Sequence, residues 1–581
     1  MKKPLNRFLL PTMAFALTTF ALTNTAHAKI PMSRSFSTLS NLEETDLARL
    51  LDYRNAKGEA LHSKSATTPL PNLWATLDSL LDGVEGTSTE KAYRDSKMPD
   101  SGREIIVAVI DGGIDIKHED LKGKIWVNYA ELGGSPGVDD DGNGFVDDIY
   151  GWNFLGNKKG ENINATTLEV TREYARLKAK QDKNGLTPAE KIYFNQVSDQ
   201  FDEGLGEAQE NLRQYREILM AIQLLKANGL KDESVDSVMK IHSEDPDVIA
   251  AQDICIAVFS DPKTNSSEAI AAVIDDLNAK IQYQYNPNFD SSTLVGDHPE
   301  ILDEAGYGNA DVTGPSAMHG THVAGIIAAN RDNNIGIAGQ ADHVKIMAVR
   351  AVPNGDERDK DVANAIYYAV KNGANVINMS FGKPFSPHKS YVDSAVAYAE
   401  KHGVIIVHAA GNDGQNTESG ANNFPNKKIV VDQGTHLAKN WIEVGASSKS
   451  KDSTLAAHFS NWGKTSVDLF APGVGIVSTV PGNKYRSLDG TSMASPEVAG
   501  IAALLMTRFP EKTSTEIIEA MMNTTTQYPG IVVDRTLNDG SRTKVNFADL
   551  SLSGGVINTE NAMLNLLGIP ATPSKLASTH P

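Results

Sequence analysis

Two histidines, His319 and His322, lie three positions apart in the stretch SAMHGTHVAGIIAAN, among small residues and beside an apolar run. Side chains of this type bind metals, pack in a core, or transfer protons as a catalytic base. Zinc binding fits poorly, because no cysteine or glutamate stands nearby at a zinc-ligand spacing and a zinc-peptidase helix would read H-E-x-x-H. The choice between base and packing residue depends on the groups that the fold brings to each imidazole.

A serine nucleophile with an oriented base is the chemistry that the other segments allow. Ser492 begins the apolar stretch in GTSMASPEVAGIAALLM, with Pro496 close to the first helical turn, where proline is tolerated. Backbone N–H groups at a helix start can hold an oxyanion. Because a serine alone is a weak nucleophile, it needs a base such as His319, and that base needs an orienting group. Asp111, at the end of a buried strand, can supply that group.

Asn412 adds a fourth candidate, because a side-chain amide can donate to a developing oxyanion. It stands in VHAAGNDG, after another apolar run. Each signal has a common structural explanation: an aspartate after a strand is usually a turn or a helix cap, and both GTS and Asn-Asp-Gly are usually loops. Their conjunction in one chain favours nucleophilic catalysis.

Strands that alternate with helices must position these residues. The stretches EIIVAVIDGGID, VKIMAVRAV, ANVINMSFG and VIIVHAAGN predict buried strands. KDVANAIYYAVKNG and SYVDSAVAYAEKHG predict helices that end at Gly373 and Gly403. This order predicts an α/β, three-layer fold with a mostly parallel sheet and helices on both faces. Ligands bind at the carboxyl ends of such strands, where Asp111, Ser380 and Asn412 fall.

Residues 155–310 predict a mostly helical, acidic insert. The apolar positions of two stretches repeat at helical spacing: Leu212, Tyr215, Ile218, Leu219, Ile222 and Leu225 in the first, and Ile270, Ile274, Leu277 and Ile281 in the second. One interpretation is a solvated helical hairpin or small bundle packed on the core. The other is a docking or gating element that recruits a partner.

The segments VAVIDGGID, HGTHVAGI, VINMSFG, AAGNDG and GTSMASPEVAG together resemble the landmark segments of the subtilisin-like serine peptidases, the subtilases. They follow the family's order of aspartate, histidine, asparagine and serine. LFAPGVGIVSTVPGNKY and SGGVINTENAM are similar to later segments of the same family. The resemblance spans residues 87–567, a predicted catalytic domain that the insert interrupts.

The resemblance implies a role for each candidate residue. Asp111 would be the buried orienting carboxylate, His319 the general base and then the general acid, and Ser492 the nucleophile. Asn412 and the backbone N–H of Ser492 would form the oxyanion hole. His322 matches a structural position and would pack behind the helix start.

The resemblance also implies an extended edge that pairs with the substrate backbone and, with a second segment, lines the primary specificity pocket. The residues concerned are Ser380, Phe381, Gly382, Ala410 and Gly411. Phe381 and Lys383 depart from the leucine and glycine common in the family, and Glu497 stands where many members have histidine. We expect Phe381 to narrow the cleft and Glu497 to have little effect on the chemistry.

A second candidate site lies in GVDDDGNGFVDDIYGW. Asp139, Asp141 and Asn143 match the first half of a calcium loop, and Asp147 falls at its ninth position. The twelfth position is Tyr150 rather than glutamate, so the loop is not a complete EF-hand. The alternatives are a structural calcium site and an acidic, glycine-rich surface turn; no cofactor is expected for the chemistry itself.

Composition and the chain ends limit where the protein acts and on what. A net charge of -19 argues against a nucleic-acid partner. Residues 1–28 predict a cleaved signal peptide, favoured over a membrane anchor because the apolar run is short and broken. Residues 29–86 are a candidate pro-segment or N-terminal extension, and residues 568–581 a tail. The single cysteine, Cys255, lies in an apolar run and is expected to be buried.

The function that these features favour is an exported serine endopeptidase, secreted or periplasmic, that hydrolyses proteins or peptides with broad or apolar preference. One alternative is a catalytically silent binding protein on the same fold. Another is a dedicated processing protease whose acidic insert recruits one partner.

Overall fold

The computed structural model describes residues 73–94, 102–261, 265–304, 306–418, 423–431, 434–537 and 540–569. These residues form two compact units. Unit 1 takes its described residues from 69–173 and 288–581, and unit 2 from 174–287. The predicted signal peptide, most of the candidate pro-segment and nearly all of the C-terminal tail lie outside the described residues.

Within the described part of unit 1, nine strands form one sheet in the order β12-β15-β9-β8-β5-β4-β1-β3-β2, and only the β12–β15 pair is antiparallel. In that order the strands are Thr526–Gln527, Gly555–Val556, Leu469–Pro472, Trp441–Ser447, Ile405–Ala409, Val376–Met379, Ile105–Asp111, Val344–Arg350 and Gly151–Asn153. Three hairpins lie apart from the sheet: β6–β7 (Lys428–Val431, Gly434–Leu437), β10–β11 (Ile476–Val480, Lys484–Leu488) and β13–β14 (Val532–Thr536, Arg542–Asn546). The predicted mostly parallel α/β sheet is confirmed.

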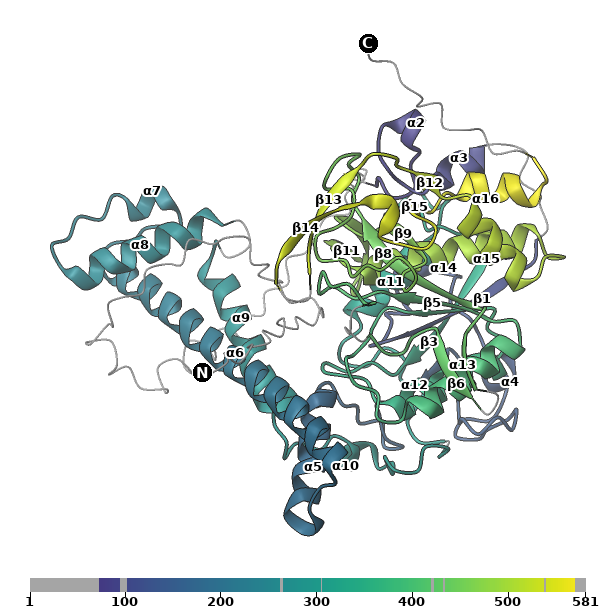
Figure 1. Ribbon diagram of the computed structural model, residues 1–581, viewed down its shortest axis with the longest axis horizontal. Coiled ribbons are helices and arrows are strands. Elements are labelled where there is room, and N and C mark those ends of the chain that lie inside the picture. The colour runs from purple at the N-terminus through teal and green to yellow at the C-terminus, as the bar shows by residue number, and fades with distance from the viewer. Residues whose placement is uncertain are drawn as a thin grey trace, which may run out of the picture. The chain divides into compact units, whose positions relative to one another are not determined.

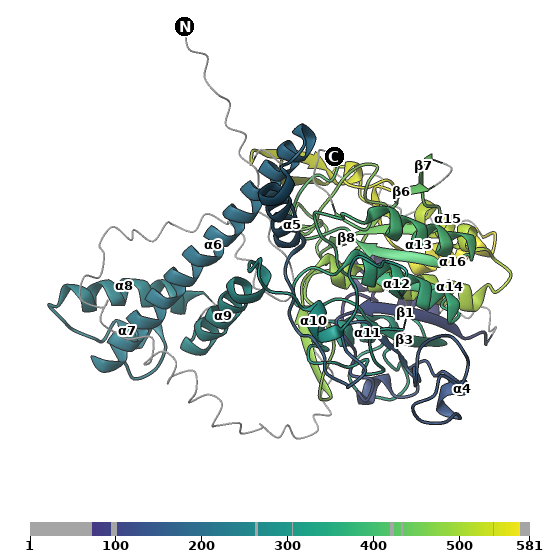
Figure 2. The same cartoon turned by 90° about the horizontal axis from the view of Figure 1, so that it is seen from below.

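The helices of unit 1 cover both faces of this sheet (Figure 1 and Figure 2). Helices α11 (Met318–Ala328) and α14 (Thr491–Arg508) pack on one face, and α12 (Asp359–Lys371) and α13 (Lys389–Lys401) on the other. The remaining helices are α2 (Ser79–Asp82), α3 (Thr89–Arg94), α4 (Tyr129–Leu132), α10 (Ser292–Val295), α15 (Ser514–Asn523), α16 (Thr559–Leu566) and the 3₁₀ turns η2 (Glu119–Leu121) and η4 (Phe547–Asp549). Two apolar cores, one on each face, hold the three layers together.

The local sequence explains where these elements begin and end. β1 is almost entirely apolar and buried along its length, as expected of a central parallel strand. α12 and α13 stop just before Gly373 and Gly403, whose φ angles of 83° and 70° place them in the left-handed region that ends helices. These are the stops that the sequence predicts.

Residues 73–94 belong to the core of unit 1. Trp74 is buried among residues of the α11 and α14 side, and its indole N–H donates to the carbonyl of Val474 at 3.2 Å. Tyr528 donates its hydroxyl to Glu85 at 2.6 Å. The part of the predicted 29–86 segment that the structure describes is therefore packed into unit 1, which its weak hydrophobic pattern did not indicate.

Unit 2 is helical. α5 (Glu169–Asn184) enters it, and α6 (Pro188–Ala227), the long helix of Figure 2, packs against α8 (Pro246–Ser260) and α9 (Ser267–Ala279), followed by the π-helix η3 (Lys280–Gln284). A short helix, α7 (Val235–Val238), precedes α8. The core contains the predicted apolar faces and a buried Cys255, whose thiol pKa burial raises to about 12.

The separate unit is smaller than the predicted insert of 155–310, because both flanks of the insert pack with unit 1. Thr166 and Ser291, on the two flanks, are joined by a hydrogen bond of 2.9 Å between their hydroxyls. Among the described residues, no helix is both long enough and apolar enough to cross a membrane.

Candidate active site

Asp111 and His319 are joined by a two-pronged hydrogen bond. Asp111 ends β1, and His319 lies in the first turn of α11. The Nδ1 of His319 is 2.9 Å from each carboxylate oxygen of Asp111, and both side chains are buried. The backbone N–H of Gly112 also donates to Asp111 Oδ1, at 2.7 Å. The imidazole is thus held with Nε2 turned away from the carboxylate.

The environment of His319 raises the pKa of its imidazole. Burial acts to lower this pKa, but the charge of Asp111 and the hydrogen bond to it act in the opposite direction and outweigh burial. The net result is a pKa above the ordinary value of about 6.5. A carboxylate that stabilises the charged imidazole in this way makes the neutral imidazole a stronger base.

Ser492 is the second residue of α14 and contacts Ser380, which follows β4. The Ser492 hydroxyl donates to the carbonyl of Ser380 at 3.1 Å, and no hydrogen bond from it to His319 occurs among the described residues. Pro496 has no N–H, so the helix leaves the carbonyl of Ser492 without its usual partner. That carbonyl accepts the Ser380 hydroxyl instead, at 3.0 Å.

Asn412, three residues beyond the end of β5, is oriented by Thr491. Its Oδ1 accepts hydrogen bonds from the Thr491 backbone N–H at 2.8 Å and from the Thr491 hydroxyl at 3.0 Å. With its oxygen held in this way, the amide Nδ2 remains available as a donor. The N–H of Ser492, in the first turn of α14, has no intrahelical acceptor.

His322 packs under the hairpin β10–β11. Its Nε2 donates to the carbonyls of Ile476 and Arg486 at 3.1 and 2.9 Å. Burial, the largest influence, lowers the pKa of this imidazole to about 3, so the ring is neutral. This environment agrees with a packing residue.

Two asparagines that the sequence did not single out brace the predicted specificity pocket. Asn461 donates from Nδ2 to the carbonyl of Ala410 at 2.9 Å, and a Cβ on Gly411, where φ is 98°, would meet that nitrogen at 2.4 Å. Asn423 donates to Ala409 O at 3.0 Å, and its Oδ1 would lie 2.1 Å from a Cβ on Gly382. Asparagines in loops carry no local signal of this role.

Comparison with known proteins identifies the fold that carries this site. The sequence profile described as "Subtilase family" matches residues 102–548, well over half of the chain. The chain belongs to the subtilase family.

Three curated relatives show the extent of the similarity. The chain is 43% identical to "Thermophilic serine proteinase" of Bacillus sp. (strain AK1) over 215 residues, which are 36% of this chain and 48% of the relative. It is 37% identical to "Subtilisin DY" of Bacillus licheniformis over 209 residues, 36% of this chain and 70% of the relative. It is 37% identical to "Subtilisin E" of Bacillus subtilis (strain 168) over 213 residues, 36% of this chain and 51% of the relative. The matched stretch spans about half the length of two of these relatives.

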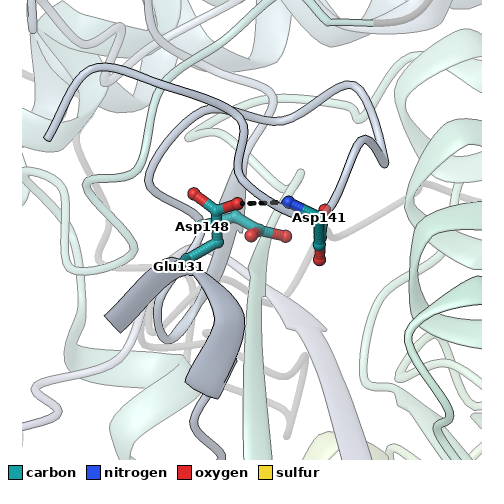
Figure 3. Close-up of side chains that lie close together, drawn as sticks. All are labelled: Glu131, Asp141 and Asp148. Carbon is teal, nitrogen blue, oxygen red and sulfur yellow. Dashed lines mark hydrogen bonds between the residues drawn. The ribbon is translucent and has the colours of Figure 1, made fainter. Parts of the chain in front are cut away.

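A group of three carboxylates lies in this subtilase chain near the predicted calcium loop. Glu131, Asp141 and Asp148 each present a carboxylate oxygen within 4.8 Å of the others. Figure 3 shows the three side chains lying close together. Glu131, from α4, and Asp148 are buried, whereas Asp141 is exposed. Hard oxygen ligands at this spacing fit a calcium ion.

Of the four predicted calcium ligands, only Asp141 is part of this group. Asp139 accepts hydrogen bonds from the backbone N–H groups of residues 142–144, and Asp147 from that of Gly137. Asn143 donates from Nδ2 to both Asp141 and Asp148 at 3.1 Å. Glu131 and Asp148 were missed because they lie outside the alternating positions of a calcium loop.

Proposed function

We propose that the protein is an exported serine endopeptidase that hydrolyses peptide bonds through an acyl-enzyme. The observation that carries this proposal is the buried two-pronged hydrogen bond between Asp111 and His319, beside helix α14, whose second residue is Ser492. Membership of the subtilase family supports it, as do the names of the matched relatives.

Acylation would begin when the Ser492 hydroxyl turns from Ser380 O toward His319 Nε2. The imidazole takes the hydroxyl proton while Oγ forms a bond to the substrate carbonyl carbon. The negative charge that develops on the carbonyl oxygen is held by Asn412 Nδ2 and by the N–H of Ser492. His319 then gives its proton to the leaving nitrogen, and the C–N bond breaks.

Deacylation repeats these steps with water. His319 takes a proton from a water molecule, whose oxygen attacks the acyl carbon, and then returns a proton to Ser492 Oγ as that bond breaks. Asp111 keeps its charge throughout and stabilises the imidazolium in both steps. No cofactor is needed for any of these transfers.

A structural calcium ion is the second part of the proposal. Glu131, Asp141 and Asp148 would hold it, and it would stabilise the loop between α4 and β2 without entering the reaction. Binding to the folded state alone would raise the free energy of unfolding.

A catalytically silent protein on this fold would keep the scaffold and lose the reactive serine. A fluorophosphonate probe distinguishes the two, because it labels only a serine whose hydroxyl is activated. We expect stoichiometric labelling of the mature protein and none of Ser492→Ala. Equal labelling of both proteins, or of neither, would contradict the proposed nucleophile.

Export itself rests on the predicted signal peptide, and the substrates would be proteins or peptides met outside the cytoplasm. A processing protease with one natural target is the remaining variant of this function. The only feature that favours it is the acidic helical unit 2, and the binding of a partner by this unit is a hypothesis.

A further inference from the structure

The edge that would pair with substrate backbone is short. It consists of Ser380, Phe381 and Gly382, beyond the end of β4. The backbone of Lys383, the next residue, is already paired with Phe424 in both directions, at 3.0 and 2.9 Å. Among the described residues, the backbone groups of Phe381 and Gly382 have no such partner. An extended substrate that pairs with this edge advances along it by one residue for each residue of the edge. The three edge residues can therefore pair with about three substrate residues.

A second chain segment lies across from this edge. β3 and β4 are the two neighbours of β1 in the sheet and run parallel to it. The segments that follow β3 and β4 therefore lie on either side of the end of β1, where Asp111 stands. The extension of β3, residues 351–357, is occupied by the flank of the insert. Thr166 N–H donates to Asn354 O at 3.0 Å, and Asn354 N–H to Asn164 O at 2.8 Å.

Arg172, near the start of α5, holds the end of the same extension. Its guanidinium donates to the carbonyls of Asp356 and Glu357 at 3.1 and 3.2 Å and is itself paired with Glu169 at 2.7 Å. The insert therefore forms hydrogen bonds where an extended substrate would otherwise find free backbone carbonyls.

Lys383 ties the two extensions together. Its ammonium contacts the carbonyl of Glu357 at 2.8 Å, the carboxylate of Glu169 at 2.7 Å and that of Asp359 at 2.8 Å. The contacts with Glu357 and Glu169 are hydrogen bonds, the contact with Asp359 is an ion pair, and the lysine side chain is 1% exposed. With Lys383 and Arg172 both donating to it, the Glu357 carbonyl has no lone pair left for a substrate N–H.

We propose that the Lys383 cross-link closes the part of the cleft that binds the residues before the scissile bond, so that the enzyme recognises about three of them. This proposal rests on the proposed function. Substrate would run from Ser492 along Ser380 to Gly382 and there meet the buried cross-link. A fourth residue could pair only by displacing Lys383. That displacement would leave Asp359 as a buried carboxylate without its cation, and Glu169 with Arg172 as its only cation, which is unfavourable.

The sequence indicated this cross-link only through Lys383, a lysine at a position where the family commonly has glycine. Its meaning was hidden, because Glu169 and Arg172 lie more than two hundred residues earlier, in the flank of an insert. We expect substrates that are recognised through a short sequence before the scissile bond, including peptides cleaved close to their amino terminus.

The test is a series of fluorogenic peptides that share one scissile bond, taken from a major casein cleavage site, with two to five residues before it. We expect kcat/KM of the mature protein to rise up to three residues and then stay level, within about twofold, since no further pairing is gained. A further rise of fivefold or more at the fourth or fifth residue would overturn the inference and leave the proposed function standing. No hydrolysis of any peptide, with no fluorophosphonate labelling, would overturn both.

A variant with the cross-link removed provides the matched comparison. In Lys383→Met combined with Glu169→Gln, one ammonium and one carboxylate are lost together, so less uncompensated charge is buried. We expect this protein to gain a dependence on the fourth residue, whereas lengthening the leaving side affects it and the parent alike. A folded double variant with a profile identical to the parent would contradict the role of Lys383, and if it fails to fold the parent series still decides.

Discussion

Asp111 determines how the site responds to pH, because it raises the pKa of the His319 imidazole. The imidazole of His319 must be neutral to accept a proton, and its pKa lies above 6.5 because Asp111 outweighs burial. Activity should therefore fall as pH drops through this raised pKa. The pairing stabilises the fold below the unfolded pKa of about 6.5, and this contribution is lost as pH rises through the folded pKa.

Replacing Asp111 with asparagine removes the negative charge that raises the pKa of His319 and leaves the imidazole buried. We expect the acidic limb of kcat/KM to move to lower pH, because burial alone lowers the pKa of His319. Turnover should fall by about 10⁴-fold, the order found for this aspartate in serine peptidase triads. The measurement is a pH–rate profile of both proteins; a limb at the same pH in the variant would show that Asp111 does not set this pKa.

Glu497 is a buried residue close in sequence to Ser492, and we expect it to affect stability. It is buried in α14, accepts a hydrogen bond from Gln340, and forms no ion pair among the described residues. Burial raises the pKa of its carboxyl to about 8. The folded protein keeps this proton between pH 4.5 and about 8 while the unfolded chain releases it, so the free energy of unfolding falls as pH rises through that window.

The variant Glu497→Gln should lose this pH dependence. At pH 9 we expect its free energy of unfolding to exceed that of the parent by about 1–3 kcal/mol, the range for an inadequately paired buried polar group. At pH 4 the two should be nearly equal. Guanidinium unfolding in a Ser492→Ala background avoids self-digestion, and a variant that is less stable at pH 9 would contradict the assignment.

At the scale of elements, the strands and helices of the sheet layers were predictable, because the spacing of apolar residues and the residue that ends each element are local features of the sequence. Gly373 and Gly403 end α12 and α13 where the sequence indicated. Contacts between distant segments were not predictable. Thr491 orienting Asn412, and Asn461 bracing Ala410, depend on loops that meet only in the folded chain.

The loop between α4 and β2 gives a prediction at this scale, because the sequence and the structure name different calcium ligands. Glu131 occurs only in the structural group and Asp139 only in the sequence pattern. Calcium at a hundred times its Kd should stabilise the parent by about 2.7 kcal/mol. We expect Glu131→Gln to lose the calcium-induced rise in Tm and Asp139→Asn to keep it. The opposite result would favour the loop pattern, and no rise in the parent would exclude the site.

At the scale of the whole molecule, the chain consists of a subtilase unit interrupted by a separate helical unit. The apolar faces of unit 2 were predicted from their period, but its limits at 174 and 287 were not, because the flanks look equally helical or irregular in sequence. Only the structure shows that residues 164–172 belong to unit 1 and form hydrogen bonds with residues 354–357. The flanks therefore belong to unit 1, and unit 2 is the separate part of the insert.

Deleting residues 174–287 and joining the flanks with a short glycine linker tests that separation. The hydroxyls of Thr166 and Ser291 are in contact, so the two flanks lie close enough to be joined. We expect casein hydrolysis and the peptide-length profile to remain, because every residue assigned to the chemistry and the cross-link is retained. A folded deletion protein without casein activity would show that unit 2 is needed by the active site itself.

In the proposed function, Ser492, activated by His319 and Asp111, attacks the peptide bond of the substrate. The most direct measurement is casein hydrolysis by the mature protein beside Ser492→Ala, at equal concentration and with circular dichroism to show that both are folded. We expect activity in the parent and its loss in the variant, by about 10⁶-fold, the size known for the nucleophile of subtilisin. Equal hydrolysis by the two proteins, or none by a folded parent freed of its signal peptide, would contradict it.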